Sequence, residues 1–96
     1  PVGMPDFEWD DAKAVENDRK HGVTFEAAIT AFADPFAVEI VDDREDYGEE
    51  RMILLGLASG VVLAVVFTER EGRIRIISAR RATKHEQAHY FEQRPA

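Results

Sequence analysis

The sequence contains no cysteine, which excludes a disulfide framework and any metal site built from thiolates. Its apolar runs are short: the longest, Val61–Phe67, has the length of a strand and falls below the ~18 residues of a membrane-spanning helix. A glycine-rich phosphate loop, a serine-nucleophile motif and a dinucleotide fingerprint are also missing. We therefore expect a cytoplasmic protein that neither spans a membrane nor carries a cofactor.

The chain has 96 residues, of which 45% are hydrophobic and 32% charged, a composition typical of a globular protein. A chain of this length can build one hydrophobic core, so we predict one domain over residues 1–96, with residues 1–6 as a lead outside the fold.

Charge is distributed unevenly along the chain. The net charge is −7, yet residues 70–96 carry seven basic and three acidic side chains, while residues 1–69 carry five basic and 16 acidic ones. Basic residues gathered against the mean charge of a protein indicate a local anion site, because bulk attraction does not explain them.

Two helices are predicted in the first third of the chain. Asp10 is a suitable N-cap for a helix that ends at His21, and Gly22 fits the left-handed position that follows. Thr24 caps a second helix with an apolar residue at every third or fourth position, and Pro35 follows its end.

Four strands joined by short turns are predicted next, which indicates an antiparallel meander. A short strand or an extended lead is also expected at Phe7–Trp9. The third of the four strands is apolar throughout and is therefore expected at the centre, covered on both faces. The four strands cover Phe36–Val41, Arg51–Leu57, Val61–Phe67 and Arg73–Ala79.

A last helix is predicted from the capping-box spacing of Thr83 and Glu86, and it runs to about Glu92. Ala88 and Phe91 are its expected apolar contacts, so we predict that it packs weakly. The predicted order of two helices, a four-stranded antiparallel sheet and a C-terminal helix gives the fold class α+β.

Two interpretations stand for the arginines of the fourth strand. Arg73 and Arg75 share one face of that strand and are candidate phosphate ligands. Alternatively, they form cross-strand ion pairs with Glu39 and Glu69.

Anion binding is the favoured interpretation for Arg80 and Arg81, because adjacent guanidinium groups beside a capped helix start suit phosphate oxygens. Lys84 opens that helix and adds a further positive charge.

The three histidines give a weaker signal. His21 is a candidate general base or acid, although a cation at a helix C-terminus is the simpler interpretation. His85 and His89 lie four residues apart without a third ligand in a recognisable pattern, so no metal site is expected.

The loop Asp42–Glu50 is acidic at six of its nine positions. It lacks the spacing of a calcium-binding loop, so it is either a solvated loop or a segment that pairs with a basic partner or with the arginines of the same chain.

A series of short motifs resembles the BrnT toxin family over residues 7–90. The motifs are Phe7-Glu8-Trp9-Asp10, Lys13, Asn17, Lys20-His21-Gly22-Val23, Phe25-Glu26-Ala27-Ala28, Asp34-Pro35, Gly48-Glu49-Glu50-Arg51 and the run 73–83. The chain departs from the family pattern where Glu45 and Asp46 follow Arg44, at a place where many relatives have a histidine.

The resemblance implies a RelE-like fold and a bacterial ribonuclease toxin of a type II toxin–antitoxin pair. It also implies a cognate antitoxin with a ribbon-helix-helix domain, which makes the DNA contacts of the complex. A homodimer is a further possibility that the sequence leaves open.

The leading hypothesis is metal-independent RNA cleavage, in which the 2′-hydroxyl attacks the adjacent phosphate. The expected catalytic residues are His21 or Glu69 for proton transfer and Arg80, supported by Arg70 or Arg73, for stabilising the phosphorane. Flanking phosphates are assigned to Arg73, Arg75, Arg81 and Lys84. The alternative is a non-catalytic module whose arginine-rich strand and last helix dock an antitoxin or a second copy of the chain.

Overall fold

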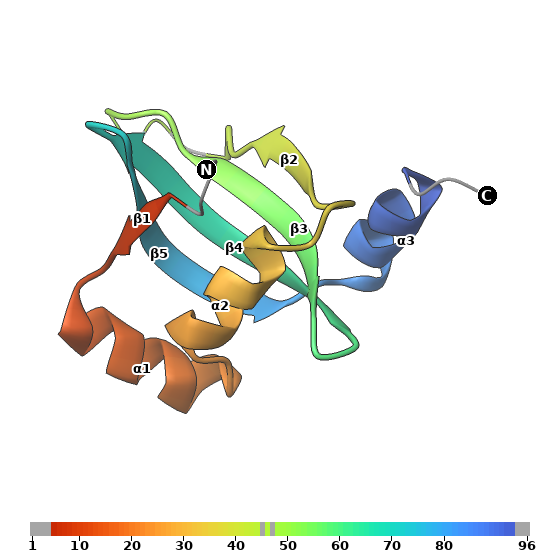
Figure 1. The fold of residues 1–96 in the computed structure, drawn as a ribbon, viewed down its shortest axis with the longest axis horizontal. Coiled ribbons are helices and arrows are strands. Elements are labelled where there is room, and N and C mark those ends of the chain that lie inside the picture. Colours follow the sequence, from red (N-terminus) through yellow and green to blue (C-terminus); the bar gives the residue numbers. More distant parts are fainter. Residues whose placement is uncertain (1–4, 45, 47, 94–96) are drawn as a thin grey trace.

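Residues 5–44, 46 and 48–93 are described by a computed structural model. They form one five-stranded sheet in the order β1-β5-β4-β3-β2, with α1 and α2 in front of it and α3 beside it (Figure 1). The elements are β1 (Asp6–Glu8), α1 (Asp11–His21), α2 (Phe25–Phe32), β2 (Val38–Val41), β3 (Met52–Ala58), β4 (Val61–Arg70), β5 (Arg73–Arg81) and α3 (Lys84–Glu92).

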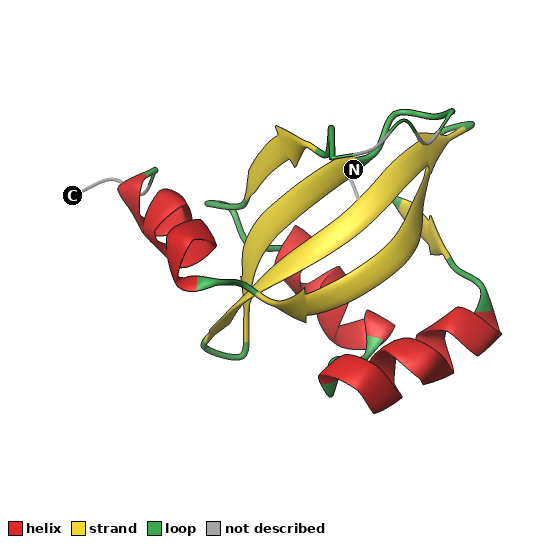
Figure 2. Ribbon diagram, turned by 180° about the vertical axis from the view of Figure 1, so that it is seen from behind, coloured by secondary structure: helices red, strands yellow, loops and turns green. Residues whose placement is uncertain are grey.

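The α+β prediction is confirmed, with one strand added. Strands β2 to β5 form the expected antiparallel meander, and β1 pairs in parallel with β5, so that Asp6 lies opposite Arg73 and Glu8 opposite Arg75. The expected sheet of four strands therefore has five, and Asp6, expected outside the fold, belongs to β1. Figure 2 shows the second face of the sheet, which α1 and α2 do not cross.

Both faces of the sheet are packed. On one face, α2 residues such as Phe25 and Ala28 lie against Phe67 and Ile76, and all four are at most 2% exposed. A second group of buried residues on the other face consists of Ile53, Leu55, Val62, Ala64, Val66, Ala82 and Tyr90. Strand β4 contributes to both groups, which confirms the predicted central strand.

Asn17 fixes α1 to the free edge of β5. Its Nδ2 donates to the carbonyls of Val23 at 2.9 Å and Ala79 at 2.8 Å, and its Oδ1 accepts from the Ala79 N–H at 3.1 Å. Strand β1 ends opposite Arg75, so beyond it the edge of β5 has no strand partner and Asn17 satisfies its backbone. His21 lies one helical turn further along α1 and lines a hollow together with Ile77 and Ser78 of β5.

Helix α3 is anchored more firmly than the sequence predicted. Tyr90 is fully buried, and its hydroxyl donates to the Asp34 carboxylate, which also accepts from the N–H groups of Phe36 at 2.9 Å and Leu57 at 2.8 Å. The predicted contacts Ala88 and Phe91 are both exposed, so that expectation was wrong. Neighbouring helix positions point about 100° apart, and Tyr90 rather than Phe91 faces the sheet.

Candidate functional site

The basic residues near the end of the chain form two groups at opposite ends of β5. Arg73 pairs with Arg70 across the β4–β5 turn, whereas Arg80 and Arg81 lie opposite Ala64 and Leu63. Arg80 lies seven positions after Arg73, which corresponds to about 23 Å at ~3.3 Å per strand residue. The basic residues of β5, which the sequence led us to expect in one local anion site, are therefore divided between two places.

At the turn end, the arginines of β5 are paired with a carboxylate of β1. Arg75 Nη1 donates to Glu8 Oε2 at 2.9 Å, and Arg73 Nη1 lies 3.7 Å from Glu8 Oε1. The ion-pair interpretation is thus confirmed for both arginines, but the expected partners Glu39 and Glu69 were wrong. The parallel pairing of β1 with β5 brings Glu8 to this position instead.

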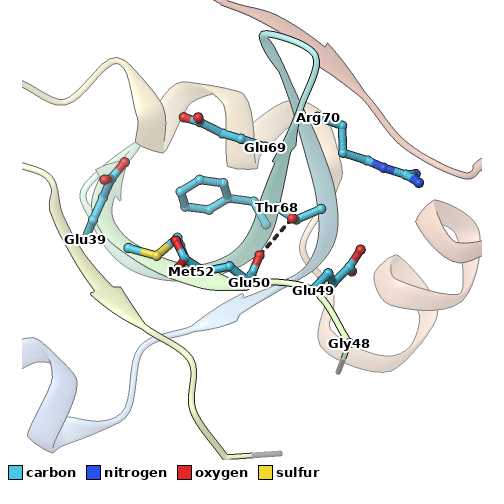
Figure 3. Close-up of a pocket in the computed structure, with 9 residues that line it drawn as sticks. Glu39, Gly48, Glu49, Glu50, Met52, Thr68, Glu69 and Arg70 are labelled. Carbon is cyan, nitrogen blue, oxygen red and sulfur yellow. Dashed lines mark hydrogen bonds between the residues drawn. The ribbon is translucent and has the colours of Figure 1, made fainter. Parts of the chain in front are cut away.

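A cavity of about 540 Å³ adjoins the turn end, and its lining is predominantly acidic (Figure 3). Met52 and Phe67 provide the apolar part of the lining. In Figure 3 the guanidinium of Arg70 points away from the carboxylates of Glu39 and Glu69. The charged residues of the lining are Glu39, Glu49, Glu50, Glu69 and Arg70. The negative charge of this cavity repels a phosphate, so RNA is not expected to bind beside Glu69 and Arg70. Both residues also lie at the opposite end of the sheet from Arg80.

At the far end, Arg80 makes a two-pronged ion pair with Glu86. Its Nη1 donates to Oε1 at 2.7 Å and its Nη2 to Oε2 at 3.0 Å, and Nη1 also lies 3.4 Å from the Arg81 carbonyl. Of the five N–H groups of Arg80, Nε–H and one on Nη2 have no partner among the described residues, so this side chain still has donors for a phosphate.

Glu86 also completes the predicted capping box of α3. Its Oε1 accepts from the Thr83 N–H at 2.9 Å, and its own N–H donates to Thr83 Oγ1 at 3.1 Å. The hydrogen bonds from Arg80 hold the pKa of the Glu86 carboxyl below its ordinary value, against the opposing effect of burial.

Arg81 makes no ion pair with any described residue and is exposed. It lines a cavity of about 220 Å³ that also contains Gly22 and Thr24. The residue before Gly22, His21, lines a second hollow of about 190 Å³ together with Lys20 and Ser78. The two hollows therefore flank the link between α1 and α2, on either side of the end of β5.

Positive charge exceeds negative charge around these two hollows. Lys13 and Lys20 line the His21 hollow, and its carboxylate, Glu16, is paired with Arg19, which lowers the pKa of Glu16. Lys84 is exposed at the first position of α3. Of the sequence-predicted site residues, the structure places His21, Arg80, Arg81 and Lys84 at this far end of β5, and Glu69, Arg70, Arg73 and Arg75 toward the turn end.

Two carboxylates of the acidic loop pair with arginines that are close to them in the sequence. Arg44 Nε donates to Asp42 Oδ1 at 2.7 Å and Arg51 Nε to Glu49 Oε2 at 3.3 Å. Glu45, where the chain departs from the family pattern, lies outside the described residues. Within residues 5–44, 46 and 48–93, no three His, Asp or Glu side chains are arranged to hold a metal ion, and no helix is both long and apolar enough to cross a membrane.

Sequence reasoning missed two residues that contact β5, Asn17 near its far end and Glu8 toward its turn end. Asn17 is 6% exposed although asparagine is usually a surface residue, and the available signal was a polar residue on the inward face of α1, one turn after Ala14. Glu8 was missed because a strand of only three residues does not specify its partner.

Comparison with protein families identifies a family that the chain matches. A model described as "Ribonuclease toxin, BrnT, of type II toxin-antitoxin system" matches residues 9–86, which is well over half of the chain and confirms the resemblance found from the motifs. A comparison with curated proteins found no match.

Proposed function

The chain belongs to the BrnT family of ribonuclease toxins of type II toxin–antitoxin systems, and we propose that it cleaves RNA at the far end of β5 without a metal ion. One observation carries the choice of this end over the other. Asn17 bonds α1 to Ala79, so that Lys20 and His21 lie beside the strand end that carries Arg80 and Arg81.

The proposed chemistry uses the substrate's own nucleophile. The 2′-oxygen forms a bond to the adjacent phosphorus, the bond from phosphorus to the 5′-oxygen breaks, and the products are a 2′,3′-cyclic phosphate and a 5′-hydroxyl. The imidazole of His21 makes one of the two proton transfers: it accepts the 2′-hydroxyl proton or donates a proton to the leaving 5′-oxygen. A water molecule makes the other transfer.

Cationic side chains stabilise the charge that develops on the phosphorane. Arg80 contributes the N–H groups that Glu86 leaves unused. Arg81 follows it on the strand and therefore points to the other face of the sheet, where it holds a flanking phosphate in this proposal. Lys84 holds a flanking phosphate. Fixed donors of this kind supply much of the rate in such reactions because they need no reorganisation when the charge appears.

Glu69, Arg70, Arg73 and Arg75 have no chemical role in this proposal. Arg73 and Arg75 are already paired with Glu8, and the acidic cavity disfavours a polyanion beside Glu69 and Arg70.

RNA cleavage by the purified chain in EDTA tests the proposal. The wild-type chain should leave 2′,3′-cyclic phosphate ends, and His21→Ala should lower kcat/KM by about a hundredfold, a typical contribution of general acid–base catalysis. The matched control is His89→Ala, which changes a histidine on α3. A requirement for added divalent metal, or full activity of His21→Ala, contradicts the proposal.

A type II system implies a protein antitoxin as partner. We propose that this antitoxin carries a ribbon-helix-helix domain and that DNA is bound only through it, because a chain with net charge −7 is a poor ligand for DNA. Co-expression with the neighbouring short reading frame and a DNA-binding assay check this. DNA binding by the toxin alone would contradict it.

A second candidate function is docking without catalysis. The observation that favours it is the Arg80–Glu86 ion pair, because Glu86 already accepts some of the hydrogen bonds that Arg80 would otherwise donate to a phosphate. On this alternative, the arginine-bearing strand end and α3 bind the antitoxin or a second copy of the chain. Growth arrest with RNA decay on expression favours the nuclease, whereas a harmless chain that still binds its antitoxin favours docking.

A further inference from the structure

The cavity beside Arg81 is lined by apolar side chains, three hydroxyl groups and one arginine. It lies between the first turns of α2, the β3–β4 turn and the ends of β4 and β5 that meet there. Thr24, Ala27 and Thr30 follow one another at intervals of three along one side of α2, and Ser59 faces them from the turn. Arg81 lies at its margin, on the strand next to Leu63.

The chemistry of this lining suits a flat heteroaromatic ring. The apolar walls are Val23, Ala27, Ala58, Val61 and Leu63. Hydroxyl groups come from Thr24, Thr30 and Ser59, and Thr24 Oγ1 accepts from the Ala27 N–H at 3.0 Å, which leaves the hydroxyl hydrogen available as a donor. Ligand sites typically combine apolar walls with a few polar groups that orient the ligand, and a nucleobase presents the matching faces and edges.

The positive charge of Arg81 at the margin of the cavity suits the phosphate group of a nucleotide. Arg73, Arg75 and Arg80 are each paired with a glutamate, whereas Arg81 has no carboxylate within reach in the described part of the chain. A phosphate oxygen is the natural partner of an exposed, unpaired guanidinium. The acidic cavity at the turn end lacks this complementarity, because four of its side chains are carboxylates.

We propose that this cavity binds one nucleobase of the RNA, with the phosphate of the same nucleotide on Arg81, and thereby sets the sequence preference of cleavage. The inference rests on the proposed function, since Gly22 of the cavity directly follows His21. In this proposal the bound base belongs to a nucleotide that flanks the scissile phosphate. A volume of about 220 Å³ gives room for one base and not for a stack of several.

Binding is tested separately from cleavage with dinucleotides that carry a 2′-O-methyl group and cannot be cut. In a titration followed by amide NMR shifts, the wild-type chain should respond at Thr24, Ala27, Thr30 and Ser59, and a dinucleotide with one abasic position should bind about tenfold more weakly. Thr30→Phe places a ring in the cavity from an exposed position, so this variant should bind the intact and the abasic dinucleotide equally weakly. The matched control Val41→Phe adds the same ring at a site on β2 that is 59% exposed, and it should behave as wild type.

Cleavage-site sequencing on a mixed RNA provides the second readout. Thr30→Phe should flatten the base preference, whereas Arg81→Gln should lower the rate on all sequences by a similar factor. Binding at these amides without any cleavage supports the base-binding site but overturns the proposed nuclease, and with it the assignment of sequence preference to this cavity. Cleavage with an unchanged preference in Thr30→Phe, equal binding of the abasic dinucleotide, or shifts confined to another cavity overturns the inference.

Discussion

The two ends of β5 carry the same kind of residue in opposite surroundings. At the turn end, Arg73 and Arg75 share the carboxylate of Glu8, and an acidic cavity lies alongside. At the far end, Arg81 has no ion-pair partner in the described part of the chain and the nearby helix end contributes Lys20 and His21. The number of arginines on a strand therefore does not locate an anion site, because the neighbouring elements decide which of them are already neutralised.

Ordinary helix chemistry explains much of this difference. Basic residues are favoured in the last turn of a helix, and α1 ends with Arg19, Lys20 and His21 at the far end of β5. Helix α3 starts at the same end, where its first N–H groups favour anions. The turn end instead receives a short parallel strand with a glutamate and the acidic segment before β3.

The sharpest test of the comparison removes one glutamate-paired arginine from each end. Arg80→Ala should lower kcat/KM for RNA by about a hundredfold, roughly 3 kcal/mol of transition-state stabilisation, because it removes charged donors at the scissile phosphate. Arg73→Ala should stay within about twofold of wild type, since surface ion pairs of this kind contribute little. Initial rates on a defined RNA measure both, and equal losses in the two variants would refute the assignment of function to the far end.

The second test separates α1 from the far end. Asn17→Ala leaves the N–H and C=O of Ala79 and the carbonyl of Val23 without their partner, so the free energy of unfolding should fall by about 2–3 kcal/mol. Urea denaturation measures the loss. Asp18→Ala, at the next and exposed position, is the control and should change stability by less than ~0.5 kcal/mol. A similar small change in Asn17→Ala would show that α1 is held mainly by apolar packing.

Local signals in the sequence predicted the elements of this fold. The N-caps at Asp10, Thr24 and Thr83 and the left-handed Gly22 are all confirmed, because each depends on a few neighbouring residues. The central position of the strand over residues 61–67 is also confirmed, since an apolar residue at every position needs cover on both faces.

Long-range pairing could not be predicted in the same way. Three residues of β1 carry no pattern that selects β5 as partner, so Glu8 was not foreseen as the partner of Arg73 and Arg75. Residues close in sequence on a strand also lie far apart in space, at ~3.3 Å per residue, which divided the expected arginine cluster. The roles of His21, Arg80, Arg81 and Lys84 in RNA cleavage stay predictions.

A third test concerns the anchoring of α3, the helix that brings Glu86 to the far end. Tyr90→Phe keeps the buried ring but removes the hydroxyl that donates to Asp34, so the free energy of unfolding should fall by about 1–1.5 kcal/mol. Thermal unfolding measures the change, with the exposed Ala88→Ser on the same helix as control. An unchanged melting temperature in Tyr90→Phe would assign the anchoring to packing alone.

The smallest expected effect is the pH dependence of the Arg80–Glu86 pair. The folded-state pKa of Glu86 is lowered from an ordinary value of about 4.5, so its contribution to stability is present above that pH and is lost as pH falls through the lower folded-state value. Glu86→Gln keeps a residue that can complete the capping box but removes the charge. It should therefore lose about 1 kcal/mol at pH 7 and show a flatter decline of stability below pH 4.5 than wild type.

A double-mutant cycle assigns this effect to the pair itself. Urea denaturation midpoints are measured as a function of pH. If Arg80 is the main cause of the lowered pKa of Glu86, Arg80→Ala should reduce the fall of the midpoint at acid pH as much as Glu86→Gln does. The double variant should then show no further change. Additive losses would mean that each side chain is stabilised by separate neighbours. In that case Glu86 would not restrain Arg80 as Glu8 restrains Arg73, and the two ends of β5 would differ even where their ion pairs look alike.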